Sequence, residues 1–170
     1  TGGAGYIGSH TAVELMQQGY DVTIVDNLSN SNVDVLDGIT AIVGRRPEFA
    51  NIDCNDFVNL DNVFRQYPDI VGVIHFAASK AVGESVQKPL LYYRNNIGSL
   101  ITLLEVMKRH QVQNIVFSSS CTVYGQPDKA HLPVDETAPI QKALSPYGNT
   151  KQINEDIIRD EAHADANLHA

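Results

Sequence analysis

The chain begins with TGGAGYIGSH, residues 1–10, and this stretch decides the fold. Gly2, Gly5 and Gly8 form a GxxGxxG pattern that runs into a helix-like segment, residues 7–19. Glycines at such spacing allow a tight turn, a close approach of the backbone to a pyrophosphate, and close packing of helix on strand. The amino terminus of the helix offers N–H groups and a positive dipole end to phosphates. Glycine clusters are also common in ordinary turns, so the loop needs a second element.

An acidic residue at the end of the next strand supplies that element. Residues 20–26, YDVTIVD, are apolar and β-branched and end on Asp26, 18 residues beyond Gly8. A carboxylate at this position accepts hydrogen bonds from an adenosine ribose and repels a 2′-phosphate, which favours NAD over NADP. Asp26 would also suit a turn or a helix cap in DNLSNS, residues 26–31. Together, the loop and Asp26 predict dinucleotide binding.

Strands and helices alternate along the remaining chain. Near-continuous apolar strands alternating with helices are typical of a parallel sheet covered on both faces. The sequence therefore predicts an α/β fold with a doubly wound, Rossmann-type sheet. Besides 20–26, we expect strands at 48–53, 69–78 and 113–120, and besides 7–19, helices at 32–43, 56–66, 95–110 and 146–163.

Composition excludes several classes of function. Lys and Arg number 12 against 20 Asp and Glu, a net charge of −8, which argues against a broad surface for nucleic acid or an anionic membrane. Cys54 and Cys121 lie far apart, which indicates reduced thiols and, without a signal peptide or a long apolar run, a cytoplasmic protein. The six histidines have no metal-site spacing, so we expect no metal.

A tyrosine and a lysine in SPYGNTK, residues 145–151, have the spacing of an acid–base pair. Tyr147 and Lys151 are four residues apart on an expected helix and share one face. An ammonium group one turn away lowers the pKa of a phenol. Lowering that pKa by ~3 pH units requires ~4 kcal/mol of stabilisation of the phenolate. An exposed tyrosine–lysine pair does not supply that much stabilisation, so we expect the site to be partly buried. FSSSCTVYG, residues 117–125, follows an expected strand at the sheet edge where ligands bind, and its serines could share a substrate hydroxyl with Tyr147.

Four stretches resemble the extended short-chain dehydrogenase/reductase family: TGGAGYIGSH, SSSCTVYG, YGNTK, and HFAASKAVGESVQKPLLYYRNN at 75–96. The resemblance covers essentially all 170 residues and is most specific in AVGESVQKP. It implies an epimerase of galactose metabolism that interconverts UDP-galactose and UDP-glucose by transient oxidation at sugar C4, with NAD staying bound. It also implies a homodimer paired through the helices near 95–110 and 146–163.

The resemblance further implies roles for individual residues. Tyr6 and Ile7 would contact the pyrophosphate through their backbone, Asp53 would bind the adenine amine, and the Cys54 N–H would assist. The family usually has an aliphatic residue at Cys54, which a backbone contact tolerates. The other cofactor contacts implied are Asp26, Asn27, Leu28, Ser29, Asn30 and Ser31 around the ribose, then Phe76, Ala77, Ala78, Ser79, Lys80 and Asn95, with Ser120, Tyr147 and Lys151 at the reacting end.

The implied chemistry centres on three of these residues. Tyr147, as phenolate, takes the proton of the sugar 4-OH directly or through Ser120, while Lys151 holds the cofactor ribose and lowers the pKa of Tyr147. Thr122 and Lys80 join Ser120 and Tyr147 as expected substrate contacts. Alternatives are another UDP-sugar epimerase, a nucleotide-sugar 4,6-dehydratase and a non-catalytic NAD-binding domain. By the family resemblance, the dehydratases carry an Asp–Glu pair just after the serine, where this chain has Cys121, Thr122 and Val123. Non-catalytic relatives commonly lose the tyrosine and the lysine, which this chain keeps.

The glycine loop has no strand before it, although such loops follow a buried strand. In a doubly wound sheet this strand is central, and its absence would leave unpaired groups at roughly 1–3 kcal/mol each. We therefore expect residues 1–170 to be an NAD-binding domain truncated at both ends, with about five apolar residues before Thr1 and a substrate domain after Ala170.

Overall fold

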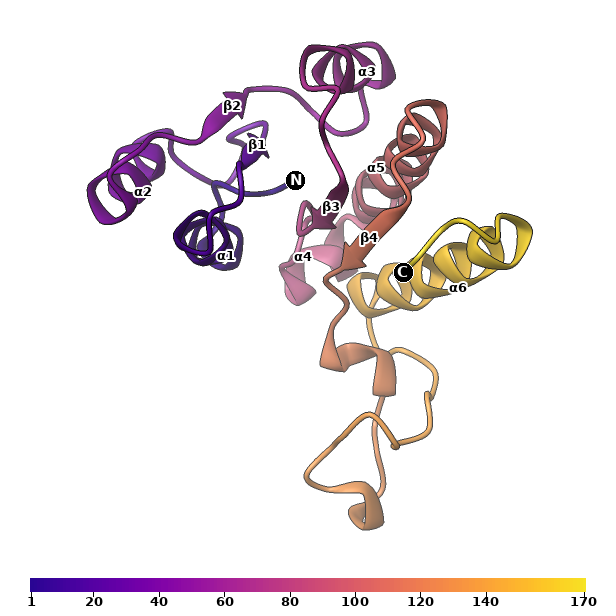
Figure 1. The fold of residues 1–170 in the computed structure, drawn as a ribbon. Coiled ribbons are helices and arrows are strands. Elements are labelled where there is room, and N and C mark those ends of the chain that lie inside the picture. The colour runs from indigo at the N-terminus through magenta and orange to yellow at the C-terminus, as the bar shows by residue number, and fades with distance from the viewer.

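The computed structural model describes residues 1–170, apart from the side chain of Ala130. Strands and helices alternate along the chain, as the sequence predicts (Figure 1). The elements are, in order, α1 (Tyr6–Gln17), β1 (Thr23–Val25), α2 (Val35–Val43), β2 (Glu48–Ala50), α3 (Phe57–Gln66), β3 (Gly72–His75), α4 (Val82–Gln87), α5 (Pro89–Arg109), β4 (Asn114–Phe117), the 3-10 turns η1 (Cys121–Tyr124) and η2 (Lys129–His131), and α6 (Pro146–Ala164).

The strands form parallel pairs. β1 lies beside β2, with Ile24 opposite Phe49, and β3 lies beside β4, with Ile74 opposite Val116. Parallel strands joined through helices are the arrangement of a Rossmann-type α/β fold. The predicted fold class is therefore confirmed.

The backbone of the first two residues lies between these strand pairs. The Gly2 N–H donates to the carbonyl of Val25, the last residue of β1, at 2.7 Å. On the other side, the Thr1 nitrogen donates to Ile74 O at 2.8 Å, and the Phe76 N–H donates to Thr1 O at 3.0 Å. The glycine loop therefore starts between the two strand pairs, with β1 on one side and β3 on the other (Figure 1). The strand expected before Thr1 stays a prediction.

Helices cover both faces of β1. Neighbouring residues of a strand point to opposite faces, and here Ile24 and Val25 belong to different apolar clusters. Ile24 packs with α1 and α2, through Ala12, Met16, Leu36 and Ile39. Val25 packs with α3, α5, β4 and α6, through Leu60, Leu100, Leu103, Met107, Ile115 and Ile158. This is the two-sided cover that the apolar strands predict.

The segment before the long helix differs from the sequence-based expectation. We expected a helix over 95–110, whereas α5 begins at Pro89, and α4 precedes it over Val82–Gln87. Proline suits the first turn of a helix because its missing N–H has no partner there. α4 is short, has no side-chain cap, and leaves Val82 and Val86 exposed. Its sequence therefore has little of the amphipathic period by which helices are recognised.

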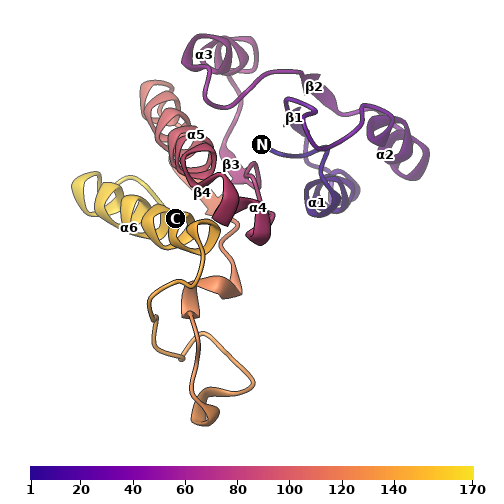
Figure 2. The same ribbon diagram turned by 180° about the vertical axis from the view of Figure 1, so that it is seen from behind.

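Residues 121–145 form a lobe that extends away from both strand pairs (Figures 1 and 2). The expected irregular stretch, 126–145, makes up most of it and contains η2. The lobe ends where Ser145 caps α6, its Oγ accepting from the Gly148 N–H at 3.1 Å, and Pro146 takes the first helical position. The lobe thus returns directly to the helix that carries Tyr147.

Replacing Gly8 by Ala tests the close packing of the glycine loop. A Cβ at Gly8 would overlap the Gly2 carbonyl and lie 2.8 Å from the Gly3 Cα. We expect Gly8→Ala to lower the free energy of unfolding by about 3 kcal/mol, measured by urea denaturation. The control is Gly38→Ala in α2, where a Cβ meets nothing within 4 Å. It should stabilise by about 0.5–1 kcal/mol, and equal effects of both changes would contradict the packing argument.

Candidate cofactor and catalytic site

The first turn of α1 presents unpaired backbone donors. Gly5, the residue before the helix, supplies no side-chain cap, and no described residue accepts a hydrogen bond from the N–H groups of Tyr6, Ile7 or Gly8. The side chains of Tyr6 and Ile7 are exposed. Free amides at the positive end of a helix dipole are a binding site for an anion such as a pyrophosphate.

Asp26 supports this loop from the end of β1. Its Oδ2 accepts from the Ala4 N–H at 3.0 Å, and its Oδ1 accepts from the Leu28 N–H and the Ser31 Oγ, both at 2.9 Å. Leu28 takes a positive φ of 56° to make this turn. Asp26 therefore stabilises a turn, which was one of the two roles expected for it. It also lies at the end of the strand beside the glycine loop, which is the position that dinucleotide binding requires.

The expected adenosine contacts gather next to Asp26, beyond the ends of β1 and β2. Asn27 Nδ2 donates to Asp53 Oδ2 at 3.0 Å. Partial burial raises the pKa of the Asp53 carboxyl, but hydrogen bonds from Asn55 and Asn27 outweigh it and leave the pKa below its usual value. Asp53 is thus an acceptor at neutral pH. Cys54 is buried, which raises the pKa of its thiol and leaves only its backbone for a ligand.

A buried amide holds the loop that leaves β3, residues 76–80. Asn96 of α5 is 1% exposed, accepts from the Ser79 N–H at 2.8 Å and donates to Ser79 O at 2.9 Å. It also donates to Thr150 Oγ1 of α6 at 3.1 Å, and Asn95 donates to Ser79 Oγ at 3.1 Å. Lys80 is exposed, with no hydrogen bond or ion pair to any described residue. The sequence predicted Asn95 as a contact and missed Asn96.

Lys151 is buried, as the acid–base argument requires. It is 3% exposed, its Nζ donates to Ser118 O at 2.6 Å, and Nζ lies 4.6 Å from the centre of the Phe117 ring. Burial lowers the pKa of this ammonium group to about 8, although Glu155 opposes the shift. Tyr147 lies one turn earlier and is half-buried, and its hydroxyl has no hydrogen bond to a described residue. It is therefore open to a ligand.

The turn after β4 brings Ser120 to the same region. Ser120 Oγ accepts from the Thr122 N–H at 3.3 Å and from Thr122 Oγ1 at 3.0 Å, and it donates to no described residue. Gly148, next to Tyr147, allows close contact, because a Cβ there would lie 3.2 Å from Thr122 Cβ. Ser120 and Thr122 thus lie on the turn that packs against the start of α6, the helix that carries Tyr147 and Lys151.

A second tyrosine near Tyr147 was not predicted. Tyr92 is fully buried, its hydroxyl donates to Glu84 Oε2 at 2.9 Å and accepts from the Ala81 N–H at 3.0 Å. Burial, and then the Glu84 carboxylate, raise the pKa of Tyr92, and the charge of Tyr147 adds to this. Tyr92 is therefore held in its neutral form and is not available as a base.

Gln152 joins the two segments of chain at the base of the lobe, residues 123–125 and 141–143, which we call the two arms of its neck. The sequence did not predict this role. Gln152 Nε2 donates to Val123 O at 2.7 Å on one arm and to Gln141 O on the other, while its Oε1 accepts from the Ala143 N–H at 3.3 Å. The arms touch at Gly125, where φ is +61° and a Cβ would lie 2.6 Å from the opposite backbone. A surface-type glutamine gives no signal of such a role in the sequence.

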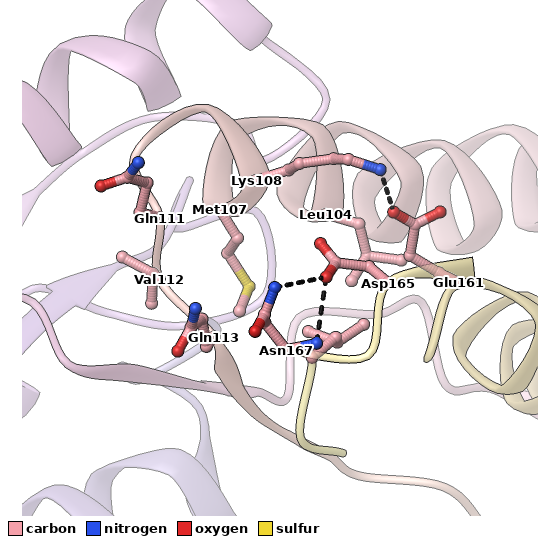
Figure 3. A pocket seen from close by; sticks show the side chains of 10 residues that line it. Leu104, Met107, Lys108, Gln111, Val112, Gln113, Glu161, Asp165 and Asn167 are labelled. Carbon is pink, nitrogen blue, oxygen red and sulfur yellow. Dashed lines mark hydrogen bonds and ion pairs between the residues drawn. The ribbon is translucent and has the colours of Figure 1, made fainter. Parts of the chain in front are cut away.

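A cavity of about 400 Å³ lies away from this site, at the far ends of α5 and α6 (Figure 3). Its walls carry the Lys108–Glu161 ion pair at 2.7 Å and the contacts of Asp165 with Asn167. Ten residues of helix, roughly 15 Å, separate Lys151 from Glu161. This cavity is therefore not the place of the acid–base pair.

Three further observations concern metal ligands, membrane-spanning helices and the cysteines. Among the described residues, no group of three or more His, Cys, Asp or Glu side chains could hold a metal ion. In the same part of the chain, no helix is long and apolar enough to cross a membrane. Cys54 and Cys121 are free thiols.

Comparison with known proteins matches the whole chain. The family model described as GDP-mannose 4,6 dehydratase matches residues 1–170. The UDP-glucose 4-epimerase of Schizosaccharomyces pombe is 51% identical over 172 residues, covering 100% of this chain and 48% of the relative. The human UDP-glucose 4-epimerase is 48% identical over 176 residues, covering 100% of this chain and 50% of the relative. The chain thus spans about half the length of these curated relatives.

Solved structures agree with this match. The crystal structure of UDP-glucose 4-epimerase from Bifidobacterium longum in complex with NAD⁺ and UDP has a TM-score of 0.93 and 46% sequence identity. It covers 96% of this chain and 48% of that chain.

Removing the Gln152 side-chain bonds should loosen the lobe. We expect Gln152→Leu to speed amide exchange over residues 121–144 by roughly 10-fold or more, because the neck loses hydrogen bonds worth about 1 kcal/mol each. Hydrogen–deuterium exchange with mass spectrometry measures this. Gln18→Leu, which removes a glutamine bonded only within α1, is the control. Unchanged exchange in the lobe of Gln152→Leu would refute the role of the neck.

Burial of the Lys151 ammonium should cost stability at neutral pH. The folded-state pKa is about 8 against 10.5 for the free side chain, so the unfolded chain binds the proton more tightly. The penalty, about 3 kcal/mol, is complete below pH 8 and fades as pH rises toward 10.5. Lys151→Met should therefore raise the free energy of unfolding at pH 7 by about 2 kcal/mol, after the loss of the Ser118 hydrogen bond. Urea titrations at pH 7 and pH 10 test this, and a variant no more stable at pH 7 would contradict it.

Proposed function

The chain belongs to the extended short-chain dehydrogenase/reductase family, and we propose that it is the NAD-binding part of a UDP-glucose 4-epimerase. The protein would interconvert UDP-galactose and UDP-glucose by transient oxidation at C4 of the sugar. The observation that carries this proposal is the buried ammonium of Lys151, one helical turn from the open hydroxyl of Tyr147 and next to the Ser120 turn.

The residues present fit NAD. The unpaired amides of Tyr6, Ile7 and Gly8 supply the donors that a pyrophosphate needs, and Asp26 places a carboxylate beside the loop. NAD held by these residues would supply a hydride acceptor and donor for C4 of the sugar. We assign the adenosine contacts to Asn27, Leu28, Ser29, Asn30, Ser31, Asp53 and Cys54, and the remaining cofactor contacts to Gly2, Gly5, Phe76, Ala77, Ala78, Ser79, Lys80 and Asn95.

Tyr147 is the base of the proposed reaction. As phenolate it accepts the proton of the sugar 4-OH, directly or through Ser120, and it gives the proton back in the return step. Lys151 stabilises the phenolate, and its own pKa of about 8 keeps most of the group charged at neutral pH. The Ser120 hydroxyl donates no hydrogen bond to a described residue, so its proton is free to bond the sugar. Thr122 and Lys80 complete the proposed substrate contacts.

The residues after Ser120 favour epimerisation over dehydration, although the family model carries a dehydratase description. Loss of water next to a carbonyl needs an acid and a base near the reacting carbons. Cys121, Thr122 and Val123 occupy the positions after Ser120, and none of them is a carboxylate. Tyr147 and Lys151 also distinguish the chain from a purely NAD-binding module.

We infer three wider properties. Residues 1–170 form the NAD-binding domain, which the loop, Asp26 and the parallel strands support. The protein works in the cytoplasm, which its free thiols support. It forms a homodimer through α5 and α6, with no nucleic acid or membrane as partner, which the net charge of −8 supports for the last two.

Removing the phenol tests the base directly. We expect Tyr147→Phe to lower kcat for UDP-galactose by roughly 100-fold or more while NAD stays bound, because only the proton acceptor is lost. The assay follows UDP-glucose formed without added NADH, and released nucleotide reports the cofactor. Tyr20→Phe, at an exposed tyrosine, is the control. Activity of Tyr147→Phe within a few-fold of the unaltered protein would sink the assignment.

A further inference from the structure

Two successive residues after β4 are tied to two successive turns of α6. Ser118 accepts through its carbonyl from Lys151 Nζ at 2.6 Å, and Ser119 donates from its Oγ to Glu155 Oε1. Glu155 follows Lys151 by four residues, so both side chains lie on one face of the helix. Ser120 directly follows these two hydrogen-bonded residues, Ser118 and Ser119. One helix face thus anchors the segment that carries the proposed catalytic serine.

Few of the groups around Lys151 can stabilise its buried positive charge. Phe117 offers a ring face, and the Ser118 carbonyl accepts one N–H. His75 faces the group from β3, but burial lowers its pKa to about 3, so it stays neutral. Tyr147 on the same helix is uncharged until it loses its proton. Among the described residues, Glu155 is the carboxylate whose charge acts to keep Lys151 protonated.

We propose that Glu155 is a positioning residue, held by Ser119, that keeps Lys151 charged beside Tyr147. The consequence for turnover rests on the proposed function, whereas the effect on Lys151 does not. Without the carboxylate, desolvation acts unopposed, and the pKa of Lys151 falls. The ammonium is then lost at lower pH, and with it the stabilisation of the Tyr147 phenolate.

The test separates charge from hydrogen bonding. Glu155→Gln keeps an oxygen that accepts from Ser119 but removes the charge, and Glu155→Asp restores the charge. Asp156→Asn neutralises the next residue, an exposed partner of Arg159, and serves as the matched control. The pKa of Lys151 is read from the ¹³Cε signals of labelled lysines in the purified protein with NAD added. The Lys151 signal is the one that disappears in Lys151→Met.

We expect Glu155→Gln to lower the pKa of Lys151 by roughly one pH unit and to move the alkaline limb of kcat by the same amount. Glu155→Asp should return both toward their original values, and Asp156→Asn should change neither. An unchanged Lys151 signal in Glu155→Gln would overturn the proposal, as would an activity loss equal at every pH. If the protein has no epimerase activity at all, the proposed function fails, while the lysine titration still decides the role of Glu155.

Discussion

The hydrogen bond from the buried ammonium of Lys151 to the Ser118 carbonyl is the contact on which the site depends. It joins α6 to the exit of β4, and it places a positive charge in the interior within one helical turn of Tyr147. Such a charge is costly in a protein core, and few positions in a fold tolerate it without a direct ion pair. Burial brings its pKa to about 8, close to the working range of an acid–base group at neutral pH.

The remainder of the site is brought together by polar groups inside the fold. Asn96 ties the loop after β3 to α6 through Thr150, and Asn154 donates to Asn96 O at 3.0 Å. Buried hydrogen-bond networks of this kind favour one arrangement of the elements that they join, although Asn154 Oδ1 has no partner among the described residues. The glycine loop is fixed by a different means, because Gly8 lets α1 approach the backbone of Gly2. Both devices act at the carboxyl ends of the strands, where parallel sheets bind ligands.

Local patterns predicted much of this from the sequence. The parallel α/β fold is confirmed, and the helices expected over 7–19 and 32–43 correspond to α1 and α2, which are followed by Gly19 and Gly44 with φ values of +94° and +83°. The partly buried setting of Tyr147 and Lys151 also followed from the chemistry that the pair must perform. Gln152 and Glu155 could not be found in this way. Their partners lie on other elements, and on a helix their side chains look like ordinary surface residues.

We propose that the protein oxidises and then reduces the same sugar carbon. UDP-galactose carrying deuterium at C4, given to the purified protein without added nucleotide, tests it most directly. We expect UDP-glucose that retains the deuterium at C4, because the label would leave and return within one site. UDP-glucose that has lost the label to water, or no UDP-glucose at all, would contradict it.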